Sequence, residues 1–330
     1  MTTPSRAIRP RPDDELIAVV RAGLLATPKR LPPWLLYDAR GSELFSEITT
    51  LPEYYPTRCE RAIFAAHGAS LMRDAADGRP LIVFELGAGT ADKTRVLLAP
   101  WAADGGGTYV PIDVSRDALA IARDRLHDEL PAIRVVPRLG RNEDARWLLA
   151  ELGGGHRRLV LFIGSSIGNY DEADAIALLR TVRAGLAPGD ALLLGTDLRK
   201  PVEELLPAYD DSRGVTAAFN RNLLVRLNRE LDANFAIDRY RHLAVWNLAA
   251  SRIEMHLESQ TDQRVEVPRA GVEVTFRLGE RLHTESSVKY DRAMVDTLLA
   301  AAGFVRERTE TDEHGRFAVH LARVPGVRGT

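Results

Sequence analysis

Between residues 81 and 195 the chain alternates short apolar runs with longer segments of amphipathic, helical spacing. The apolar runs predict strands over residues 81–86, 108–113, 133–137, 158–164 and 191–195. The amphipathic segments predict helices over residues 92–98, 116–130 and 173–186. Strands that alternate with crossover helices form a parallel, doubly wound α/β sheet, and ligands of such sheets bind at the carboxyl ends of the strands.

After Asp197 the pattern changes. A further amphipathic helix is predicted over residues 215–231, and alternating apolar and polar positions predict an antiparallel β insertion over residues 252–258, 264–267 and 272–277. A helix over residues 291–302 and strands over 304–311 and 317–324 predict an antiparallel hairpin at the end of the sheet. We therefore predict a sheet domain from residues 61–197 and 288–330, and a second, α+β domain from residues 15–60 and 198–287.

The composition narrows the choice of partners and location. A formal net charge of −2 provides no basic surface for nucleic acid or for an anionic membrane. No apolar run approaches the roughly 18 residues that a membrane-spanning helix needs. Cys59 is the only cysteine, which excludes an internal disulfide and a cysteine-based zinc cluster and favours a cytoplasmic location.

The first predicted strand ends in a glycine-rich turn, Glu85-Leu86-Gly87-Ala88-Gly89. The two glycines allow a tight turn and a close approach of the backbone to a ligand, and the acidic Glu85 can pair with an ammonium group. The third glycine of the dinucleotide-binding pattern is replaced by Asp92, which argues against a nicotinamide cofactor. The turn therefore favours the S-adenosylmethionine site of a class I methyltransferase over a strand–helix turn without a ligand.

Two charged residues fit the same site. Asp113 ends the second predicted strand, where a carboxylate can accept hydrogen bonds from the ribose hydroxyls of a nucleoside, although it could instead cap the following helix. Lys93 lies early in a predicted helix, where a cation opposes the helix dipole. This unfavourable position favours pairing of Lys93 with a ligand carboxylate over a role as a solvated surface lysine.

A competing motif follows the fourth predicted strand. Residues 164–168 fit G-x-S-x-G, the nucleophile elbow of α/β-hydrolases, with Ser166 as nucleophile and with Asp197 and either His283 or His314 as partners. The chain has no His-Gly-Gly oxyanion loop, and Asn169-Tyr170-Asp171 interrupts the helix that should follow the elbow. The hydrolase hypothesis also leaves the glycine-rich turn unexplained, so we prefer the methyltransferase.

Further motifs outside the sheet decide between these functions. Leu51-Pro52-Glu53-Tyr54-Tyr55-Pro56 is an unusual aromatic cluster, and the other distinctive segments are residues 37–45, 164–169, 195–197, 208–211, 214–222, 252–255 and 284–290. In this order, and from about residue 20 to the C-terminus, the segments closely resemble the L-histidine Nα-methyltransferases of ergothioneine biosynthesis.

The resemblance implies a reaction and its partners. Three methyl groups would pass from S-adenosylmethionine to the α-amine of free L-histidine, giving hercynine and S-adenosylhomocysteine. An in-line displacement needs alignment rather than a metal or a covalent enzyme intermediate. The sheet domain would bind the cofactor, and the second domain would bind the substrate. The enzyme would be a cytoplasmic monomer. The alternatives are a methyltransferase of another aromatic or partly methylated amino acid, and a non-catalytic S-adenosylmethionine-binding regulator.

The resemblance also implies substrate contacts. Tyr54, Asn169 and Tyr209 would hold the substrate carboxylate, and Glu285 and Ser287 would bind the imidazole. Around these groups, Thr216 would lie nearby, and Phe45 and Met255 would form apolar walls. Tyr37 and the backbone of Gly164 would lie near the reacting amine, with Tyr37 also near the cofactor and passing a proton to water. Packing is the alternative role for the tyrosines and Met255, and solvation is the alternative for Glu285.

The implied cofactor contacts are Glu85, Gly87, Gly89, Lys93, Asp113, Arg141 and Asn142. Two of them depart from the family pattern, because this chain has Gly140-Arg141-Asn142 where the family typically has Gly-Asp-Phe. The acidic residue there accepts a hydrogen bond from the adenine amino group. Asn142 could accept it through its side-chain oxygen, or a shift of one or two residues could bring in Glu143 or Asp144.

Overall fold

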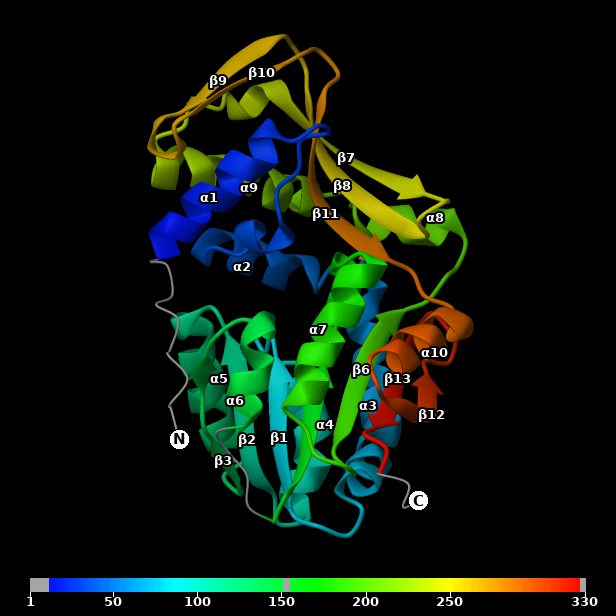
Figure 1. Ribbon diagram of the computed structural model, residues 1–330. Helices are drawn as coiled ribbons and strands as arrows, with labels where there is room; N and C mark the ends of the chain where they lie inside the picture. The colour runs from blue at the N-terminus through cyan, green and yellow to red at the C-terminus, as the bar shows by residue number, and fades with distance from the viewer. Residues whose placement is uncertain (1–11, 151–154, 327–330) are drawn as a thin grey trace. The chain divides into compact units, whose positions relative to one another are not determined.

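The computed structural model describes residues 12–150 and 155–326, which form two compact units (Figure 1). The first, here called the sheet unit, comprises Tyr55–Pro201, Ala249–Arg252 and Ser287–Thr330. The other, called the insertion unit, comprises Met1–Tyr54, Val202–Leu248 and Ile253–Ser286. No helix among the described residues is long and apolar enough to cross a membrane.

The sheet unit contains a largely parallel sheet with the strand order β12-β13-β6-β5-β1-β2-β3, and β4 also pairs with β2. Its strands are β1 (Leu81–Leu86), β2 (Gly107–Asp113), β3 (Ile133–Val135), β4 (Arg138–Leu139), β5 (Arg157–Phe162), β6 (Ala191–Asp197), β12 (Val305–Thr311) and β13 (Phe317–Arg323). Strands β1 to β6 pair in parallel, whereas β13 runs antiparallel to β6 and β12 antiparallel to β13. The predicted doubly wound α/β sheet with a closing hairpin is confirmed.

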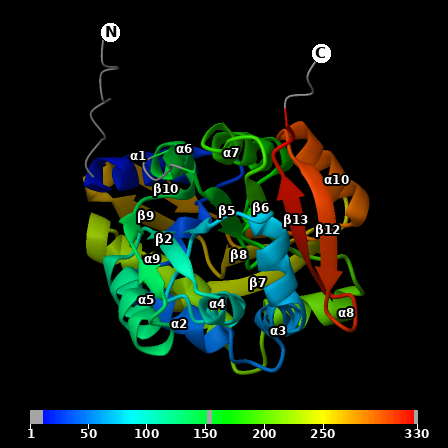
Figure 2. The same cartoon turned by 90° about the horizontal axis from the view of Figure 1, so that it is seen from below.

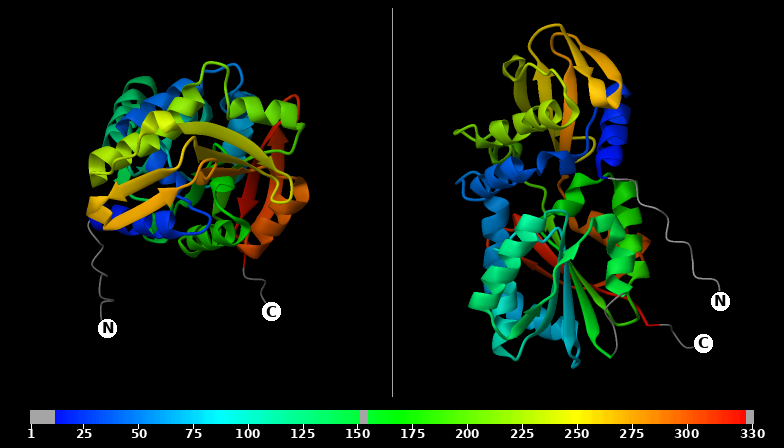
Figure 3. Two further views of the ribbon diagram at one scale, coloured as in Figure 1. Left: turned by 90° about the horizontal axis from the view of Figure 1, so that it is seen from above. Right: turned by 90° about the vertical axis from the view of Figure 1, so that its left-hand side faces the viewer.

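Helices cover both faces of this sheet (Figures 2 and 3). Alternate residues of β1, namely Ile82, Phe84 and Leu86, pack in one core with α6 (Ala145–Ala150), α7 (Glu172–Ala184) and α10 (Arg292–Ala301). The opposite face is covered by α3 (Tyr55–Ala76), α4 (Thr94–Ala103) and α5 (Arg116–Glu129). All six residues of β1 are buried because both faces are covered, which explains why this strand is an uninterrupted apolar run apart from Glu85.

The first helix of the sheet unit was not predicted. Helix α3 begins at Tyr55, so residues 55–60, which the predicted domain division joined to the N-terminal segment, are part of the sheet unit. Strand β5 ends at Phe162, before the predicted end at residue 164, because Gly164 has φ +76° and cannot continue an extended strand. The assignment of cofactor and substrate binding to separate domains remains a prediction.

The insertion unit combines helices with two small sheets. Its helices are α1 (Pro12–Leu25), α2 (Ala39–Ile48), α8 (Val202–Leu205) and α9 (Val215–Leu231). A three-stranded sheet has the order β11-β8-β7, with β7 (Tyr240–Asn247), β8 (Arg252–Ser259) and β11 (Arg281–Val288), and β9 (Gln263–Val267) pairs antiparallel with β10 (Val272–Phe276). The predicted helix over residues 215–231 and the antiparallel pairing of the strands predicted over 264–267 and 272–277 are confirmed. The strand predicted over 252–258 is β8, which belongs to the other sheet, and β7 and β11 were not predicted.

Candidate functional site

The glycine-rich turn after β1 is held against the end of β2. Gly87 and Gly89 have φ +67° and +54°, the left-handed region that favours glycine. The Ala88 N–H donates to the Ile112 carbonyl over 3.1 Å, and the Gly89 N–H donates to Asp113 Oδ2 over 2.9 Å. The structure thus brings together three of the predicted cofactor residues: Gly87 and Gly89 in the turn, and Asp113, which is hydrogen-bonded to it.

Asp113 is not the cap of the helix that follows it. Its Oδ1 accepts from the Ser115 N–H over 2.9 Å, and Ser115 itself caps α5 by accepting from the Ala118 N–H over 3.2 Å. The alternative role of Asp113 as a helix cap is therefore wrong. Its carboxylate instead accepts hydrogen bonds from the glycine-rich turn and from the start of the loop after β2.

Glu85 is buried beneath this turn, and both of its carboxylate oxygens have partners. The Thr94 hydroxyl donates to Oε1 over 2.7 Å, and the Tyr109 hydroxyl donates to Oε2. Burial disfavours the charged form and raises the pKa of Glu85 to about 7, although both hydroxyl bonds oppose the shift. A cation placed at this carboxylate would restore its ionised form, which is the property expected of a partner for a ligand ammonium group.

Lys93 and Gly164 are connected by a residue that the sequence did not single out. Glu60, on α3, is fully buried, and its Oε2 lies 2.5 Å from Lys93 Nζ. Both Glu60 oxygens also accept from the Gly164 N–H, over 2.9 and 3.1 Å. A Cβ at Gly195 would lie 2.4 Å from Glu60 Oε1, so the glycine in the Gly195-Thr196-Asp197 motif leaves room for this carboxylate. The sequence motif contains this glycine but gives no sign that Glu60 is its neighbour.

The departure from the family pattern lies in a short helical turn, η2 (Asn142–Asp144). The Arg141 N–H donates to Asp144 Oδ2 over 3.1 Å, and Asn142 Nδ2 donates to the Tyr170 hydroxyl over 3.3 Å. The amide nitrogen of Asn142 faces Tyr170. The side-chain carbonyl oxygen is therefore the atom of Asn142 that would accept a hydrogen bond from the adenine amino group. Tyr170 is the neighbour that the sequence reading missed here.

The loop after β5 does not form a nucleophile elbow. The residues with positive φ are Gly164 and Ser165 and not Ser166, whose hydroxyl donates to the Ile163 carbonyl over 3.2 Å. The turn η3 (Ser166–Asn169) follows, and α7 begins only at Glu172, as the interrupting residues predicted. Asn169, a predicted carboxylate-binding residue, ends η3 and is partly exposed.

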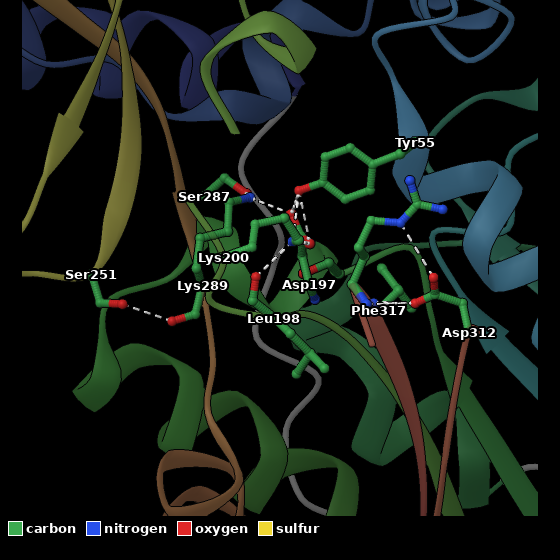
Figure 4. A network of polar contacts seen from close by, with 11 residues as sticks. Tyr55, Asp197, Leu198, Lys200, Ser251, Ser287, Lys289, Asp312 and Phe317 are labelled. Atoms are coloured by element: carbon green, nitrogen blue, oxygen red, sulfur yellow. Dashed lines mark hydrogen bonds and ion pairs between the residues drawn. The ribbon is translucent and has the colours of Figure 1, made fainter. Parts of the chain in front are cut away.

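The acid and one of the two histidines considered in the hydrolase hypothesis are engaged elsewhere. Asp197 accepts from the Tyr55 hydroxyl over 2.8 Å and pairs with Lys200 and Lys289, at 2.6 and 2.7 Å (Figure 4). His283 contacts Ser286 Oγ at 3.0 Å. Asp197 is therefore the centre of a lysine–tyrosine network and not the orienting acid of a catalytic histidine, and we reject the hydrolase hypothesis.

An aromatic cluster in the insertion unit joins three predicted site residues. The rings of Tyr37 and Phe45 are 5.4 Å apart, and those of Phe45 and Tyr54 are 6.1 Å apart, both edge to face. Phe219, on α9, packs against Tyr37 at 5.4 Å and against Phe45 at 6.0 Å. Phe219 was not predicted as a site residue, although it lies inside the distinctive segment 214–222.

Buried polar groups fix the start of α9 and the neighbouring Tyr209. Asp211 accepts from the backbone N–H groups of Val215, at 3.0 Å, and Thr216, at 2.7 Å, and these bonds help to hold the pKa of Asp211 below its usual value against burial. His242 Nε2 lies 2.8 Å from the Tyr209 carbonyl oxygen. The backbone at Thr216 and Tyr209 is therefore held in place before any ligand binds.

The predicted imidazole contacts lie on neighbouring strands. Met255 on β8 is buried, and its carbonyl oxygen accepts from the Thr284 hydroxyl of β11 over 3.0 Å. Glu285 and Ser287 are buried and stand two residues apart on β11, so their side chains emerge on the same face of the strand. Ser287 Oγ also accepts a hydrogen bond from Lys289, a residue that the sequence reading did not assign.

The similarity to known proteins extends over both units. The profile of a family described as histidine-specific methyltransferase, SAM-dependent, matches residues 16–324. The chain is 45% identical to a histidine N-alpha-methyltransferase of Mycolicibacterium smegmatis, with 92% of this chain and 93% of that protein aligned. The corresponding protein of Mycobacterium tuberculosis is 44% identical over the same shares of both chains. Ergothioneine biosynthesis protein 1 of Neurospora crassa is 31% identical over 90% of this chain and 34% of its own length.

Proposed function

Because this chain belongs to the family of S-adenosylmethionine-dependent, histidine-specific methyltransferases, we propose that it methylates the α-amine of L-histidine in the first step of ergothioneine biosynthesis. Three transfers give hercynine, the trimethyl betaine, and each transfer releases S-adenosylhomocysteine. The observation that carries this proposal is the family match over residues 16–324, which includes the glycine-rich turn and every predicted substrate residue.

The residues of the sheet unit fit the cofactor. Gly87 and Gly89 form an open turn, since a Cβ at either position would meet no heavy atom of the protein within 4 Å. Asp113 beside this turn would supply acceptors for ribose hydroxyls, and Glu85 a buried carboxylate for the ammonium group. Lys93, which pairs with Glu60, would have to contact the ligand carboxylate in addition to that partner. Arg141 and Asn142 would contact the adenine end. When bound, the cofactor supplies an electrophilic methyl group on a sulfonium.

The substrate residues divide by chemistry. Tyr54, Asn169 and Tyr209 are neutral donors, which bind the histidine carboxylate without adding an ammonium group that would compete with the reacting amine. Glu285 and Ser287 contact the imidazole, and Phe45 and Met255 supply apolar walls. Thr216 lies at the start of α9, where Asp211 holds its backbone.

The amine must lose its proton before each transfer. Tyr37 would stand beside the amine with the Gly164 backbone and pass that proton to water. Glu60 holds the Gly164 N–H and thereby fixes the peptide plane next to the reacting group. The protein otherwise supplies alignment, which suffices for an in-line displacement without a metal. We further propose a monomeric, cytoplasmic enzyme, supported only by the lone cysteine and by a small-molecule substrate.

Mass spectrometry of a mixture of free amino acids tests this function directly. After incubation with the protein and S-adenosylmethionine, we expect trimethylated histidine together with S-adenosylhomocysteine, and no methylation of the other amino acids. Methylated tryptophan with unmodified histidine would favour the alternative aromatic substrate. Absence of any methylated amino acid, although S-adenosylmethionine binds, would favour the non-catalytic regulator.

A further inference from the structure

The backbone of Tyr209 ends a short helical turn and is held by a side chain from a distant strand. In the turn η4 (Leu206–Ala208), the Tyr209 N–H donates to the Leu206 carbonyl over 2.9 Å. The carbonyl groups at the end of a helical turn have no acceptor role inside it, so they need other donors. For Tyr209 that donor is His242 on β7, whose Nε2 lies 2.8 Å from the carbonyl oxygen.

The other side of the His242 ring is held by α9. Its Nδ1 lies 2.9 Å from Nδ2 of Asn220, a fully buried residue of α9. The same amide nitrogen donates to the carbonyl oxygen of His256, on β8, over 3.0 Å. His242 is itself buried, so one imidazole ring connects the backbone after η4 with the core of the insertion unit.

These contacts define where the proton of the ring lies. A carbonyl oxygen can only accept, so His242 Nε2 carries a proton and donates it to Tyr209. The Asn220 amide must present its nitrogen to the His256 carbonyl, because the reversed amide would bring two oxygen atoms together. An amide nitrogen can only donate, so His242 Nδ1 accepts and carries no proton. The ring is therefore neutral, with its proton on Nε2.

The charged groups around His242 agree with a neutral ring. Burial lowers the pKa of His242 below its usual value, and the charge of Arg221 on α9 adds to this effect. The bond to the Tyr209 carbonyl and the carboxylates of Asp210 and Asp211 oppose the shift. Asp210 Oδ1 lies 3.9 Å from Nε2 and is exposed to solvent, which weakens its influence.

We propose that His242 is a positioning residue for the substrate, because its Nε2–H holds the Tyr209 backbone where the Tyr209 side chain meets the substrate carboxylate. This inference rests on the proposed function, in which Tyr209 binds that carboxylate. His242 acts through Tyr209 and does not itself contact histidine. A hydrogen bond to a carboxylate depends steeply on distance and angle, so a shift of the Tyr209 backbone lowers the affinity for histidine.

Two substitutions of His242 separate its two hydrogen bonds. The measurement is calorimetric titration of L-histidine into protein saturated with S-adenosylhomocysteine. His242→Asn keeps an acceptor near Asn220 but is too short to donate to the Tyr209 carbonyl, whereas the amide nitrogen of His242→Gln reaches the position of Nε2. We expect roughly tenfold weaker binding in His242→Asn and a change of less than about twofold in His242→Gln. If His242→Asn does not fold, His242→Leu, which offers no hydrogen bond, replaces it.

A double-mutant cycle shows whether His242 acts through Tyr209. Tyr209→Phe should weaken histidine binding, and His242→Asn should have no further effect in that background. The control is His320 of the sheet unit, a buried histidine at 2.9 Å from the hydroxyls of both Thr196 and Thr309. His320→Asn also removes a buried imidazole and should leave the affinity for histidine unchanged.

Nitrogen NMR of protein labelled on its histidine rings tests the proton position. Near pH 6.5, half of the exposed rings with an ordinary pKa of about 6.5 are charged. The resonances that disappear in His242→Gln belong to His242, and we expect them to show a predominantly neutral ring with its proton on Nε2. A charged ring, or a proton on Nδ1 alone, would overturn the inference.

The binding measurements provide three further contradictions. They are equal losses of affinity in His242→Asn and His242→Gln, additive losses in the cycle with Tyr209→Phe, and unchanged affinity in Tyr209→Phe itself. Each of these would overturn the positioning role of His242 and leave the proposed substrate in place. A wild type that does not bind histidine would instead refute the proposed substrate, and the inference with it.

Discussion

In the sheet unit the candidate residues are charged side chains and glycines at strand ends, whereas in the insertion unit most are aromatic or apolar and stand on a packed core. Glu85, Asp113 and Asp197 each bind hydroxyl, N–H or ammonium groups of neighbouring elements. Tyr37, Phe45 and Tyr54 are instead held by ring contacts, which also include Phe219.

The difference follows from what each unit is proposed to bind. A charged nucleoside cofactor is held by carboxylates, a lysine and backbone groups, and the ends of parallel strands gather such groups wherever the fold occurs. An amino acid with a small ring needs shape and a few directed polar contacts. Selectivity for histidine should therefore depend on the few polar residues of β11, and integrity of the sheet unit on its buried charges.

The largest effect on the free energy of unfolding should come from the buried Asp197 of the sheet unit, and Asp211 of the insertion unit provides the comparison. Asp197→Asn leaves Lys200 and Lys289 without a counter-charge and should lower the free energy of unfolding by about 3–5 kcal/mol. Asp211→Asn in the insertion unit leaves no cation without a counter-charge. The amide keeps one acceptor oxygen, so only the backbone N–H facing the other carboxylate oxygen loses its partner, and the change should cost about 1–2 kcal/mol. Urea unfolding followed by circular dichroism measures both free energies. Equal losses in the two variants would contradict the proposed difference between the two units.

The pH dependence of stability should show a second effect in the sheet unit. The pKa of Glu85 rises from 4.5 to about 7 on burial, so the folded state favours the protonated acid. Its stabilising contribution is complete below pH 4.5 and is lost as the pH rises through 7, by about 3 kcal/mol in total. Without ligand, Glu85→Gln should remove this decline. If the variant and the wild type lose stability in parallel between these pH values, Glu85 is ionised in the folded protein throughout.

Cofactor binding should respond to Asp113 more modestly. Asp113→Ala leaves ribose hydroxyls unpaired and releases the Gly89 N–H, so affinity for S-adenosylmethionine should fall by roughly 1–3 kcal/mol. Calorimetric titration of the folded variant gives this number. An unchanged dissociation constant would remove Asp113 from the cofactor site.

The smallest effect is expected at the serine that resembles a nucleophile. Ser166 donates only to a backbone carbonyl of its own loop, so Ser166→Ala should lower methyl transfer by less than about 1 kcal/mol in kcat/KM. The wild type should not hydrolyse simple esters. Ester hydrolysis that disappears in Ser166→Ala would instead reinstate the hydrolase.

Elements could be predicted from the sequence where the buried positions are the apolar ones. Strand β1 and helix α9 have the predicted bounds, because β1 is apolar apart from Glu85 and α9 is apolar on a single face. Strand β11 escaped prediction because its buried second half, Thr284-Glu285-Ser286-Ser287, is polar and shows no hydrophobic alternation. Such a strand is stable only through side-chain partners supplied by the folded protein, which no local pattern reveals.

The candidate site shows the same limit. Chemistry and spacing alone predict a cofactor role for the glycine-rich turn and Asp113, and the structure confirms only that Asp113 is hydrogen-bonded to that turn, whereas the predicted substrate residues depended on the resemblance to a family. Glu60 and Lys289 were missed altogether. Both are buried charges whose partners, Gly164 and Asp197 respectively, lie far away in the sequence, so their roles exist only in three dimensions.

The central claim is that the imidazole-facing residues of β11 select histidine, and steady-state kinetics of Glu285→Ala with histidine and tryptophan tests it most directly. Loss of a charge-assisted bond in a desolvated pocket should lower kcat/KM for histidine by about 2–4 kcal/mol. The matched variant Glu280→Ala removes a carboxylate that pairs with Lys29 and should leave the preference intact. We predict that Glu285→Ala sharply narrows the ratio of kcat/KM between the two substrates, and a ratio equal to that of the wild type would contradict the account.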